Sequence, residues 1–379
     1  MVHNELSQRE LRTQQAAYLY ARHGMSQEEI GRRLGGMSQS HVSRLLARAQ
    51  EIGLLVTEHR FVEHLIPAEQ MAQVLRVLET QELSSALDKF ARKTGGIFPR
   101  LSVFESGVRE GNSESARERG KAFGRAASGR VMELLSGARV VGVAWGSTLN
   151  FLTDGLPPVP SRSSRAVVQF VPICAELVAL EEPDYGSSWL AARLNQAFNG
   201  DRGMRLQLTG IPAFIPKRYK EAKARAIREY IRETASYEKI FIGPDCYVDQ
   251  MDSLITSVGS AAAPVRGSTA ELLMAAEIDT KTLRDLVVGD IGGILIPKQS
   301  LTAEKKALVD DINKMWTGLS LDRLATIARR AASGRNLGGN IVVAFGREKI
   351  ESVVQAIRMG LVNELIIDRD LENALSEAL

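Results

Sequence analysis

A pair of short capped helices joined by a glycine turn constrains the start of this chain more than any other feature. Ser26 is followed three residues later by Glu29, which is the spacing of a capping box and predicts the start of a helix. The residues 35–37 (GGM) end that helix, and Ser38 caps a second one that stops at Gly53. This pattern predicts a helix-turn-helix, whose second helix can lie in the major groove of DNA.

The second helix of this pair is expected to present a polar face to solvent. Its apolar residues repeat at helical spacing and predict the buried side. The residues expected on the solvent face, or next to it, are polar and long enough to reach base edges or phosphates. None of them is acidic. These candidate DNA-binding residues are Ser38, Gln39, Ser40, His41, Ser43, Arg44 and Arg48. An ordinary pair of surface helices is the alternative.

Flanking segments extend this unit. Residues 7–23 read as a first helix that supplies core contacts, and residues 54–62 read as a short strand or wing, with a plain exit strand as the alternative. A helical pattern from Pro67 carries an apolar stripe, which predicts either a dimerisation helix or a helix packed on the C-terminal domain. A second amphipathic piece, residues 83–94, ends at two glycines. We therefore predict a DNA-binding domain at 1–62, a linker with oligomerisation helices at 63–96, and a larger domain at 97–379.

Composition narrows the function classes. The chain has 379 residues with 44% hydrophobic and 25% charged residues, as globular proteins do. Its net charge of +3 is weakly basic, so affinity for nucleic acid has to come from a local patch. No signal peptide and no uninterrupted apolar run of about 18 residues is present, which predicts a cytoplasmic protein without membrane contact. Cys174 and Cys246 fit no metal spacing and are expected to be buried thiols.

Histidine placement limits the chemistry of the larger domain. All five histidines lie within the first 64 residues, at positions 3, 23, 41, 59 and 64. The remaining chain therefore acts without imidazole as acid, base or metal ligand. We predict no metal and no cofactor.

The larger domain alternates strand-like and helix-like segments. Helical patterns such as 113–135 and 220–233 separate runs rich in Val and Ile, which implies a doubly wound, mostly parallel α/β fold that binds ligands beyond the carboxyl ends of its strands. The basic segment 217–232 is either a second nucleic-acid surface or, as we favour, a solvated outer helix. The predicted strands are 100–105, 139–145, 166–173, 205–211, 239–243, 287–296, 340–345 and 363–368.

The strongest ligand-site candidate is GVAWGSTLNFL at 142–152. A strand is expected to end at Trp145, and Gly146, Ser147 and Thr148 then open a helix whose backbone N–H groups and hydroxyls suit a phosphate or carboxylate. A capped helix start without a ligand is equally compatible with these residues.

Two other expected strand ends carry charged residues. Asp290 in VVGDIGG follows apolar residues, where an acid can accept hydrogen bonds from sugar hydroxyls. In AFGREKI, Arg347 and Lys349 lie at a helix start, where a cation opposes the helix dipole unless an anion binds. Asp245 is a weaker candidate of the same type.

Four motifs in order resemble the SorC family of sugar-responsive bacterial transcription regulators: VSRLLARAQEIGLL, GVAWGSTL, LRDLVVGDIGG and IVVAFGREKIESVVQAI, followed by GLVNELIID. The resemblance implies a C-terminal domain similar to the glucosamine-6-phosphate deaminase and ribose-5-phosphate isomerase folds. It also implies dimers or tetramers and effectors that are phosphorylated sugars or sugar alcohols. The effector pocket would be lined by Gly146, Ser147, Thr148, Asp290 and Lys349.

These observations predict a DNA-binding transcription regulator, most simply a repressor, whose affinity for double-stranded operator DNA depends on a small anionic carbohydrate-type metabolite. The alternative is a sugar-phosphate isomerase or deaminase with an accessory N-terminal domain, because fold alone does not fix function. A protein that binds a partner through the basic segment 217–232 is a third interpretation, supported only by charge.

Overall fold

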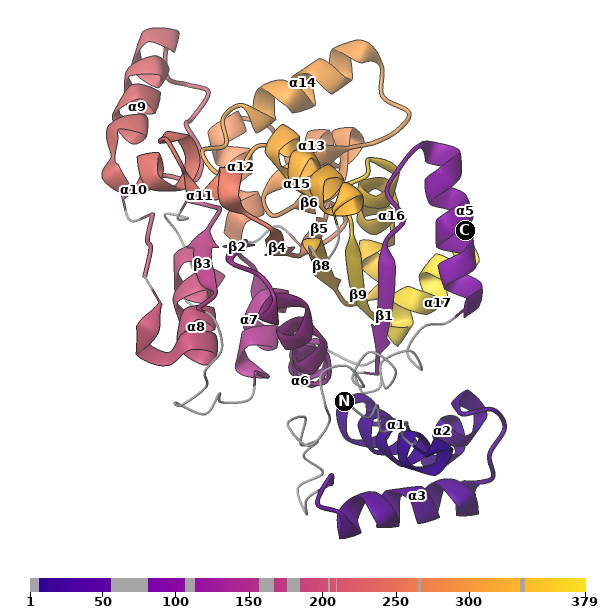
Figure 1. Cartoon of the computed structure of the whole chain (residues 1–379). Coiled ribbons are helices and arrows are strands. Elements are labelled where there is room, and N and C mark those ends of the chain that lie inside the picture. Colours follow the sequence, from indigo (N-terminus) through magenta and orange to yellow (C-terminus); the bar gives the residue numbers. More distant parts are fainter. Residues whose placement is uncertain are drawn as a thin grey trace.

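The computed structural model of the chain describes residues 7–55, 81–105, 113–156, 167–175, 185–203, 205–208, 210–264, 267–334 and 338–379. A small helical domain lies beside a larger α/β domain (Figure 1). Most of the predicted wing at 54–62 and the helix predicted from Pro67 lie outside the described residues.

The small domain is the predicted helix-turn-helix with one preceding helix. It comprises α1 (Gln8–His23), α2 (Gln27–Arg33) and α3 (Gln39–Glu51). The capping box at α2 is present, with the Glu29 carboxylate accepting from the Ser26 backbone N–H at 2.8 Å. A Cβ on Gly31 would lie 2.2 Å from the Met37 carbonyl oxygen, so only glycine permits this approach of helix and turn. The predicted helix pair is confirmed.

The α/β domain is built on six strands that pair only in parallel, in the order β1-β9-β8-β4-β2-β3. All residues of β8 and β9 are buried. Strands become buried along their full length when helices cover both faces of the sheet, so the predicted parallel α/β architecture is confirmed. The strands are β1 (Arg100–Phe104), β2 (Val140–Val143), β3 (Gln169–Pro172), β4 (Ser253–Thr256), β8 (Gly339–Ala344) and β9 (Glu364–Asp368).

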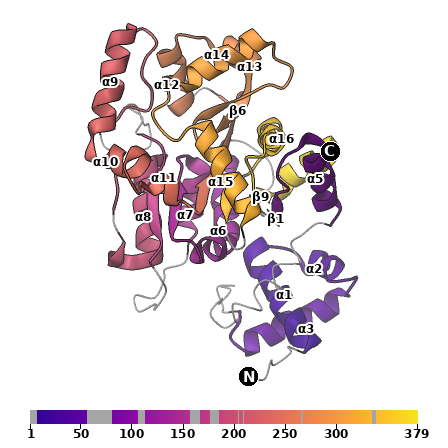
Figure 2. The same ribbon diagram turned by 45° about the horizontal axis from the view of Figure 1, so that its top comes forward.

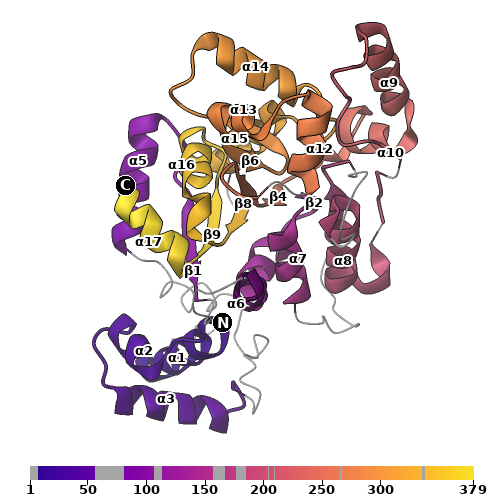
Figure 3. The same cartoon turned by 180° about the vertical axis from the view of Figure 1, so that it is seen from behind.

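Helices between the strands pack on this sheet and on each other. The helix α8 (Ser187–Asn199) packs on β3 and β2, and α15 (Leu321–Ser333) packs on β8 and β4. At the opposite edge, α5 (Gln81–Thr94), α16 (Ile350–Arg358) and α17 (Arg369–Ala378) contact one another (Figures 1 and 3). The other helices of the domain are α6 (Ser113–Ser136), α7 (Ser147–Asp154), η4 (Gly200–Arg202), α9 (Glu221–Glu233), α10 (Ala235–Tyr237), η5 (Glu238–Ile242), α11 (Tyr247–Gln250), α12 (Gly267–Ala276), α13 (Thr280–Leu286), α14 (Ala303–Asn313) and η6 (Arg347–Lys349).

A second, antiparallel sheet follows β4 directly. It pairs β5 (Val258–Ser260) with β6 (Val287–Ile291), and β6 with β7 (Ile294–Pro297). The prediction of a single strand over 287–296 was wrong, because Gly292 and Gly293 take φ of 58° and 93° and turn the chain into a hairpin. Asp290 therefore lies within β6 and not at a parallel strand end.

Two further strand predictions were wrong, and two short strands, β4 and β5, were not predicted. Residues 238–242 form the short π-helix η5, so the apolar run KIFIG is helical, and residues 205–208 form no strand. The central strand β4 is only four residues long, SLIT, and has too little sequence to show a period. It is buried along its whole length and pairs with β2 on one side and β8 on the other.

Four further findings bear on function. The helix α9 buries only Ala224 and Ile231 and stands at the edge of the molecule (Figure 2), as expected for a solvated outer helix. None of the described helices is both long and apolar enough to cross a membrane. The described residues also contain no cluster of His, Cys, Asp or Glu that would hold a metal ion. Both cysteines are free and buried, as predicted.

Candidate functional site

Two glycine loops meet beyond the carboxyl ends of the parallel strands. The loop after β2 passes through Gly146, with φ of 123°, into α7, and the loop after β8 passes through Gly346, with φ of 94°, into η6. Because β4 lies between β2 and β8, the two loops flank the end of β4. This is the edge at which doubly wound sheets bind ligands.

Lys349 reaches across from the second loop to the first. Its ammonium group donates a hydrogen bond to the Thr148 hydroxyl at 3.1 Å. Thr148 is only 2% exposed and Lys349 is half-buried. Burial lowers the pKa of Lys349, while nearby carboxylates, including that of Asp290, oppose this shift. The structure thus brings together two of the predicted effector residues, from segments far apart in the chain.

The start of α7 has the electrostatic character of an anion site. No side chain caps this helix. Its first turn carries the positive end of the helix dipole, and the Lys349 ammonium lies against the same turn. Two positive poles at one place favour an anion between them. The Gly146 N–H already donates to the Tyr185 carbonyl at 3.0 Å, so Gly146 contributes its backbone conformation rather than this donor.

Asp290 belongs to a different part of the edge. It pairs with Gly259 across the β5–β6 ladder, and its carboxylate accepts from the Gly293 N–H at 3.0 Å. Burial raises the pKa of Asp290, and the hydrogen bond from Gly293 and the charge of Lys349 oppose the rise. The carboxylate and the ammonium influence each other electrostatically, but they form no ion pair in the described part of the chain. Thr148 and Lys349 do not line the pocket that contains Asp290.

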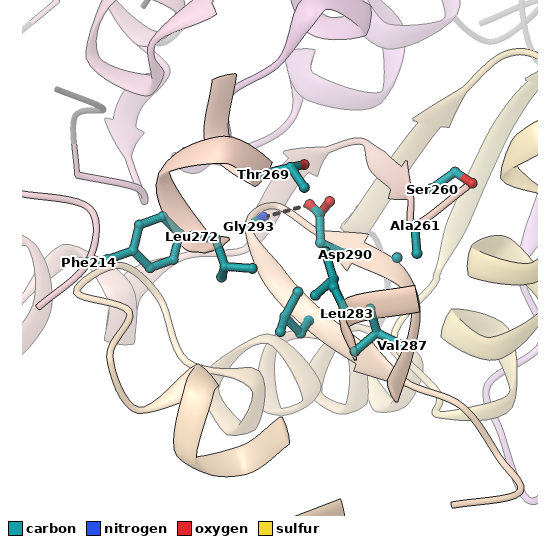
Figure 4. Close-up of a pocket in the computed structure, with 11 residues that line it drawn as sticks. Phe214, Ser260, Ala261, Thr269, Leu272, Leu283, Val287, Asp290 and Gly293 are labelled. Atoms are coloured by element: carbon teal, nitrogen blue, oxygen red, sulfur yellow. Dashed lines mark hydrogen bonds between the residues drawn. The ribbon is translucent and has the colours of Figure 1, made fainter. Parts of the chain in front are cut away.

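The carboxylate of Asp290 points into a pocket beside the second sheet (Figure 4). The pocket is small, with a volume of about 30 Å³, and it is partly open to solvent. Apart from Asp290, the polar side chains that line it are those of Ser260 and Thr269. The sequence patterns singled out only Asp290 among these lining residues. The others come from β5 and the residue after it, from α12 and α13, from the β6–β7 hairpin and from the loop before α9. The apolar lining is Phe214, Ala261, Leu272, Leu283, Val287 and Leu295.

Two weaker candidates take no part in the site. Asp245 is exposed after η5, with a φ of 58°. Arg347 forms an ion pair with Glu377 of α17 at 2.6 Å, which provides a reason for a cation at this helix start without a bound anion.

Asp368 is a buried acid at this edge that the sequence patterns did not indicate. It ends β9, and its Oδ1 accepts from the Gly346 N–H at 3.0 Å and from the Leu371 N–H at 3.2 Å. Burial raises the pKa of Asp368 to about 6, and these two N–H groups oppose the rise. An acid that ends a run of strand residues, as in ELIID, was the available signal.

The candidate DNA-binding residues of α3 are exposed, and one expectation about their surroundings needs correction. All seven candidate residues are exposed: Ser38, Gln39, Ser40, His41, Ser43, Arg44 and Arg48. The face was expected to be free of acids, but Glu51 is exposed in the last turn and pairs with Arg48 at 3.0 Å. Arg48 is therefore partly neutralised, whereas Arg44 forms no ion pair with any of the described residues.

Comparison with known proteins supports this architecture. Residues 100–375 match the family model described as "Putative sugar-binding domain". No curated protein matches the sequence. Among solved structures, the full-length sorbitol operon regulator SorC from Klebsiella pneumoniae is 20% identical, with 97% of this chain and 99% of that chain covered and a TM-score of 0.55.

Two other solved structures are similar over the larger domain. One is a domain of a possible sugar-binding transcriptional regulator from Arthrobacter aurescens TC1, 20% identical, with 79% of this chain and 98% of that chain covered and a TM-score of 0.54. The other is a transcriptional regulator from Streptococcus pneumoniae TIGR4, 15% identical, with 79% and 98% covered and a TM-score of 0.52. At these identities the likeness shows the fold, and it agrees with the resemblance drawn from the sequence motifs.

Proposed function

The chain belongs to this family of sugar-binding domains, and we propose that it is a DNA-binding transcription regulator, most simply a repressor, controlled by a small anionic carbohydrate-type metabolite. The expected effector is a phosphorylated sugar or sugar alcohol. The observation that carries the proposal is the hydrogen bond from Lys349 to Thr148 at the uncapped start of α7. An ammonium, a hydroxyl and a helix N-terminus converge there, as an anionic group requires.

The site has a second half that suits the remainder of a carbohydrate. The carboxylate of Asp290 is an acceptor for sugar hydroxyls, and Ser260 and Thr269 line the same pocket. We propose Gly146, Ser147, Thr148, Asp290 and Lys349 as the effector-binding set. The anionic end of the effector would lie at Thr148 and its hydroxyls toward Asp290.

The DNA-binding side rests on the exposed polar face of α3. Its seven candidate residues include two arginines. The acid on this face, Glu51, lies in the last turn. A helix-turn-helix reads half-sites in pairs, so we propose a homo-oligomer with two-fold symmetry, a dimer or tetramer. The effector then changes operator affinity only as far as it binds two conformations with different affinity.

A thermal-shift screen of the purified full chain tests the proposal. The panel pairs each phosphorylated sugar or sugar alcohol with its unphosphorylated form. A ligand present at 100 times its dissociation constant adds about 2.7 kcal/mol to the free energy of unfolding, which is seen as a raised melting temperature. We expect the phosphorylated members alone to raise it, and a melting temperature raised equally by both forms would contradict an anion site at Thr148.

The same panel separates a sensor from an enzyme. The ligand that raises the melting temperature is incubated with the protein, and its conversion is followed over hours. We expect no turnover. Turnover that is lost in an Asp290→Asn variant would instead favour the isomerase or deaminase interpretation.

A further inference from the structure

The DNA-binding domain is in contact with the carboxyl edge of the sheet, the same edge that carries the proposed effector site. His23, the last residue of α1, is completely buried, and its ring stacks on Phe104 at the end of β1 with a centroid distance of 4.3 Å and an interplanar angle of 12°. Neither ring nitrogen of His23 has a hydrogen-bond partner among the described residues. The ring is thus held by packing and not by polar bonds.

Charged residues of both domains surround this stack. A cavity between the domains is lined by Met25, Glu29, Arg32 and Arg33 of the helix-turn-helix and by Glu105 and Arg369 of the α/β domain. Arg369 donates to Glu105 at 2.7 Å and also pairs with Glu372. The carboxylates of Glu105 and Glu372 act on the charge of Arg33 across the cavity. The domain contact therefore joins an aromatic stack to a mixed charge network.

A short series of contacts connects the His23–Phe104 stack to Lys349. Phe104 and Asp368 are register partners in the parallel β1–β9 pair. Asp368 accepts a hydrogen bond from the Gly346 N–H at 3.0 Å. Gly346 begins the loop 346–349, whose last residue, Lys349, donates to Thr148. Each step is a direct contact, and the residue after Asp368 is the Arg369 of the charge network.

We propose that the face formed by Phe104, Glu105 and Arg369 is the docking surface for the DNA-binding domain, and that Asp368 links the effector loop to this surface. The inference rests on the proposed function, because it needs an anion at Thr148. An anion there competes with Thr148 for Lys349 and so shifts the loop 346–349. Through the hydrogen bond from Gly346 to Asp368, this shift alters the packing of His23 on Phe104. Asp368 is then a positioning residue.

Docking leaves the recognition face free. The helix α3 lies on the side of the small domain away from the sheet, and α1 lies nearer the sheet (Figures 1 and 2). Docking therefore does not cover the residues that would read DNA. Docking fixes the orientation of α3 relative to the α/β domain. In a dimer that binds two DNA half-sites, this orientation sets the spacing between the two recognition helices. Allosteric coupling between two sites typically changes the affinity at one of them by about 5- to 150-fold. Repositioning of the DNA-binding domain on this surface would have to change operator affinity by a factor in that range.

Hydrogen exchange of the full chain tests the link, with inorganic phosphate as the probe against chloride at equal ionic strength. We expect phosphate to change the exchange of amides severalfold in two segments, the loop 346–349 and the end of α1 at Tyr18–His23. In Asp368→Ala the loop should still respond and α1 should not. Asp368→Asn, which keeps an oxygen acceptor for the Gly346 N–H, should restore the response of α1. Asp370→Ala, two positions along in α17, is the matched control and should behave like the wild type.

Each other outcome is informative. A loop that responds while α1 does not, in the wild type, would overturn the link and leave the proposed function standing. A response of α1 without the loop would mean that phosphate binds in the arginine-lined cavity, which also overturns the link. No response in either segment would remove the anion site and the inference with it. Should Asp368→Ala fail to fold, Phe104→Leu removes the stack but keeps an apolar residue, and only α1 should then lose its response.

Discussion

Gly259 and Asp290 face each other across the β5–β6 pair so closely that no side chain fits between them. A Cβ on Gly259 would lie 2.0 Å from Oδ2 of Asp290. The carboxylate thus takes the space that any other residue at position 259 would fill, and this fixes its direction toward the pocket and the Gly293 N–H.

Gly259→Ala should therefore displace the Asp290 carboxylate and abolish the ligand response. We expect a loss of about 1–3 kcal/mol in the free energy of unfolding, as for other overpacked sites. The melting temperature without effector measures the loss of stability, and its rise on adding effector measures the ligand response. Gly137→Ala is the control, since nothing lies within 4 Å of a Cβ there. A Gly259→Ala variant with unchanged melting and ligand response would show that the carboxylate does not need this position.

Thr148→Val and Lys349→Gln should each reduce the stabilisation by a phosphorylated effector. Valine keeps the volume of threonine without its hydroxyl, and glutamine removes the ammonium charge, so either variant loses one charged or polar partner of the anion. Lys306→Gln, at an exposed position of α14, is the matched control. Equal stabilisation of wild type and both variants would place the anion elsewhere.

Arg44→Ala should weaken operator binding by about 1–3 kcal/mol if the side chain contacts a base edge, with relaxed specificity at one position. Electrophoretic mobility or fluorescence anisotropy measures this on operators selected from a random pool by the wild-type chain. Arg225→Ala, on the exposed face of α9, is the control and should have no effect. A larger effect from Arg225 than from Arg44 would instead make α9 the nucleic-acid surface.

Acidification should weaken the contribution of His23 to stability. Burial holds the pKa of His23 well below its ordinary value of about 6.5, and the charges of Arg33, Arg369 and Arg22 lower it further. The folded chain therefore binds fewer protons at this ring than the unfolded chain does. Its contribution is complete above about pH 6.5 and declines as the pH falls below that value.

The variant His23→Leu isolates this effect, because Asp368 acts in the opposite direction. Its pKa is raised to about 6, so the folded chain takes up this proton more readily than the unfolded chain and acid relieves the burial of its charge. We expect the melting temperature of the wild type to fall relative to His23→Leu between about pH 7.5 and about pH 5.5. A constant difference between the two proteins would mean that His23 binds protons equally in the folded and unfolded chains.

The sequence was sufficient for features that local patterns encode. The capping box at Ser26 and the glycine turn after α2 predicted the helix-turn-helix, and alternating apolar segments predicted the parallel sheet. The strand-to-helix loops at Gly146 and Gly346 were also identified from their glycines and from the residue types that follow them.

Features that depend on tertiary contacts were not predictable. The four residues of β4 become a central strand only because β2 and β8 pair with them. Asp290 was indicated as a candidate, but the pocket beside it forms only when α12 and α13 pack against the hairpin. The stack of His23 on Phe104 joins two domains and has no sequence signal of its own.

The pairing of β1 with β9 has a consequence for the order in which the molecule is made. The edge strand β1 pairs only with β9, which lies near the other end of the known sequence. During synthesis the helix-turn-helix has all of its own residues long before the surface that Arg369 completes. Contacts so distant along a chain close late in folding. A nascent chain therefore carries an undocked DNA-binding unit until β9 and Arg369 have been added, and only then can the sheet restrain it.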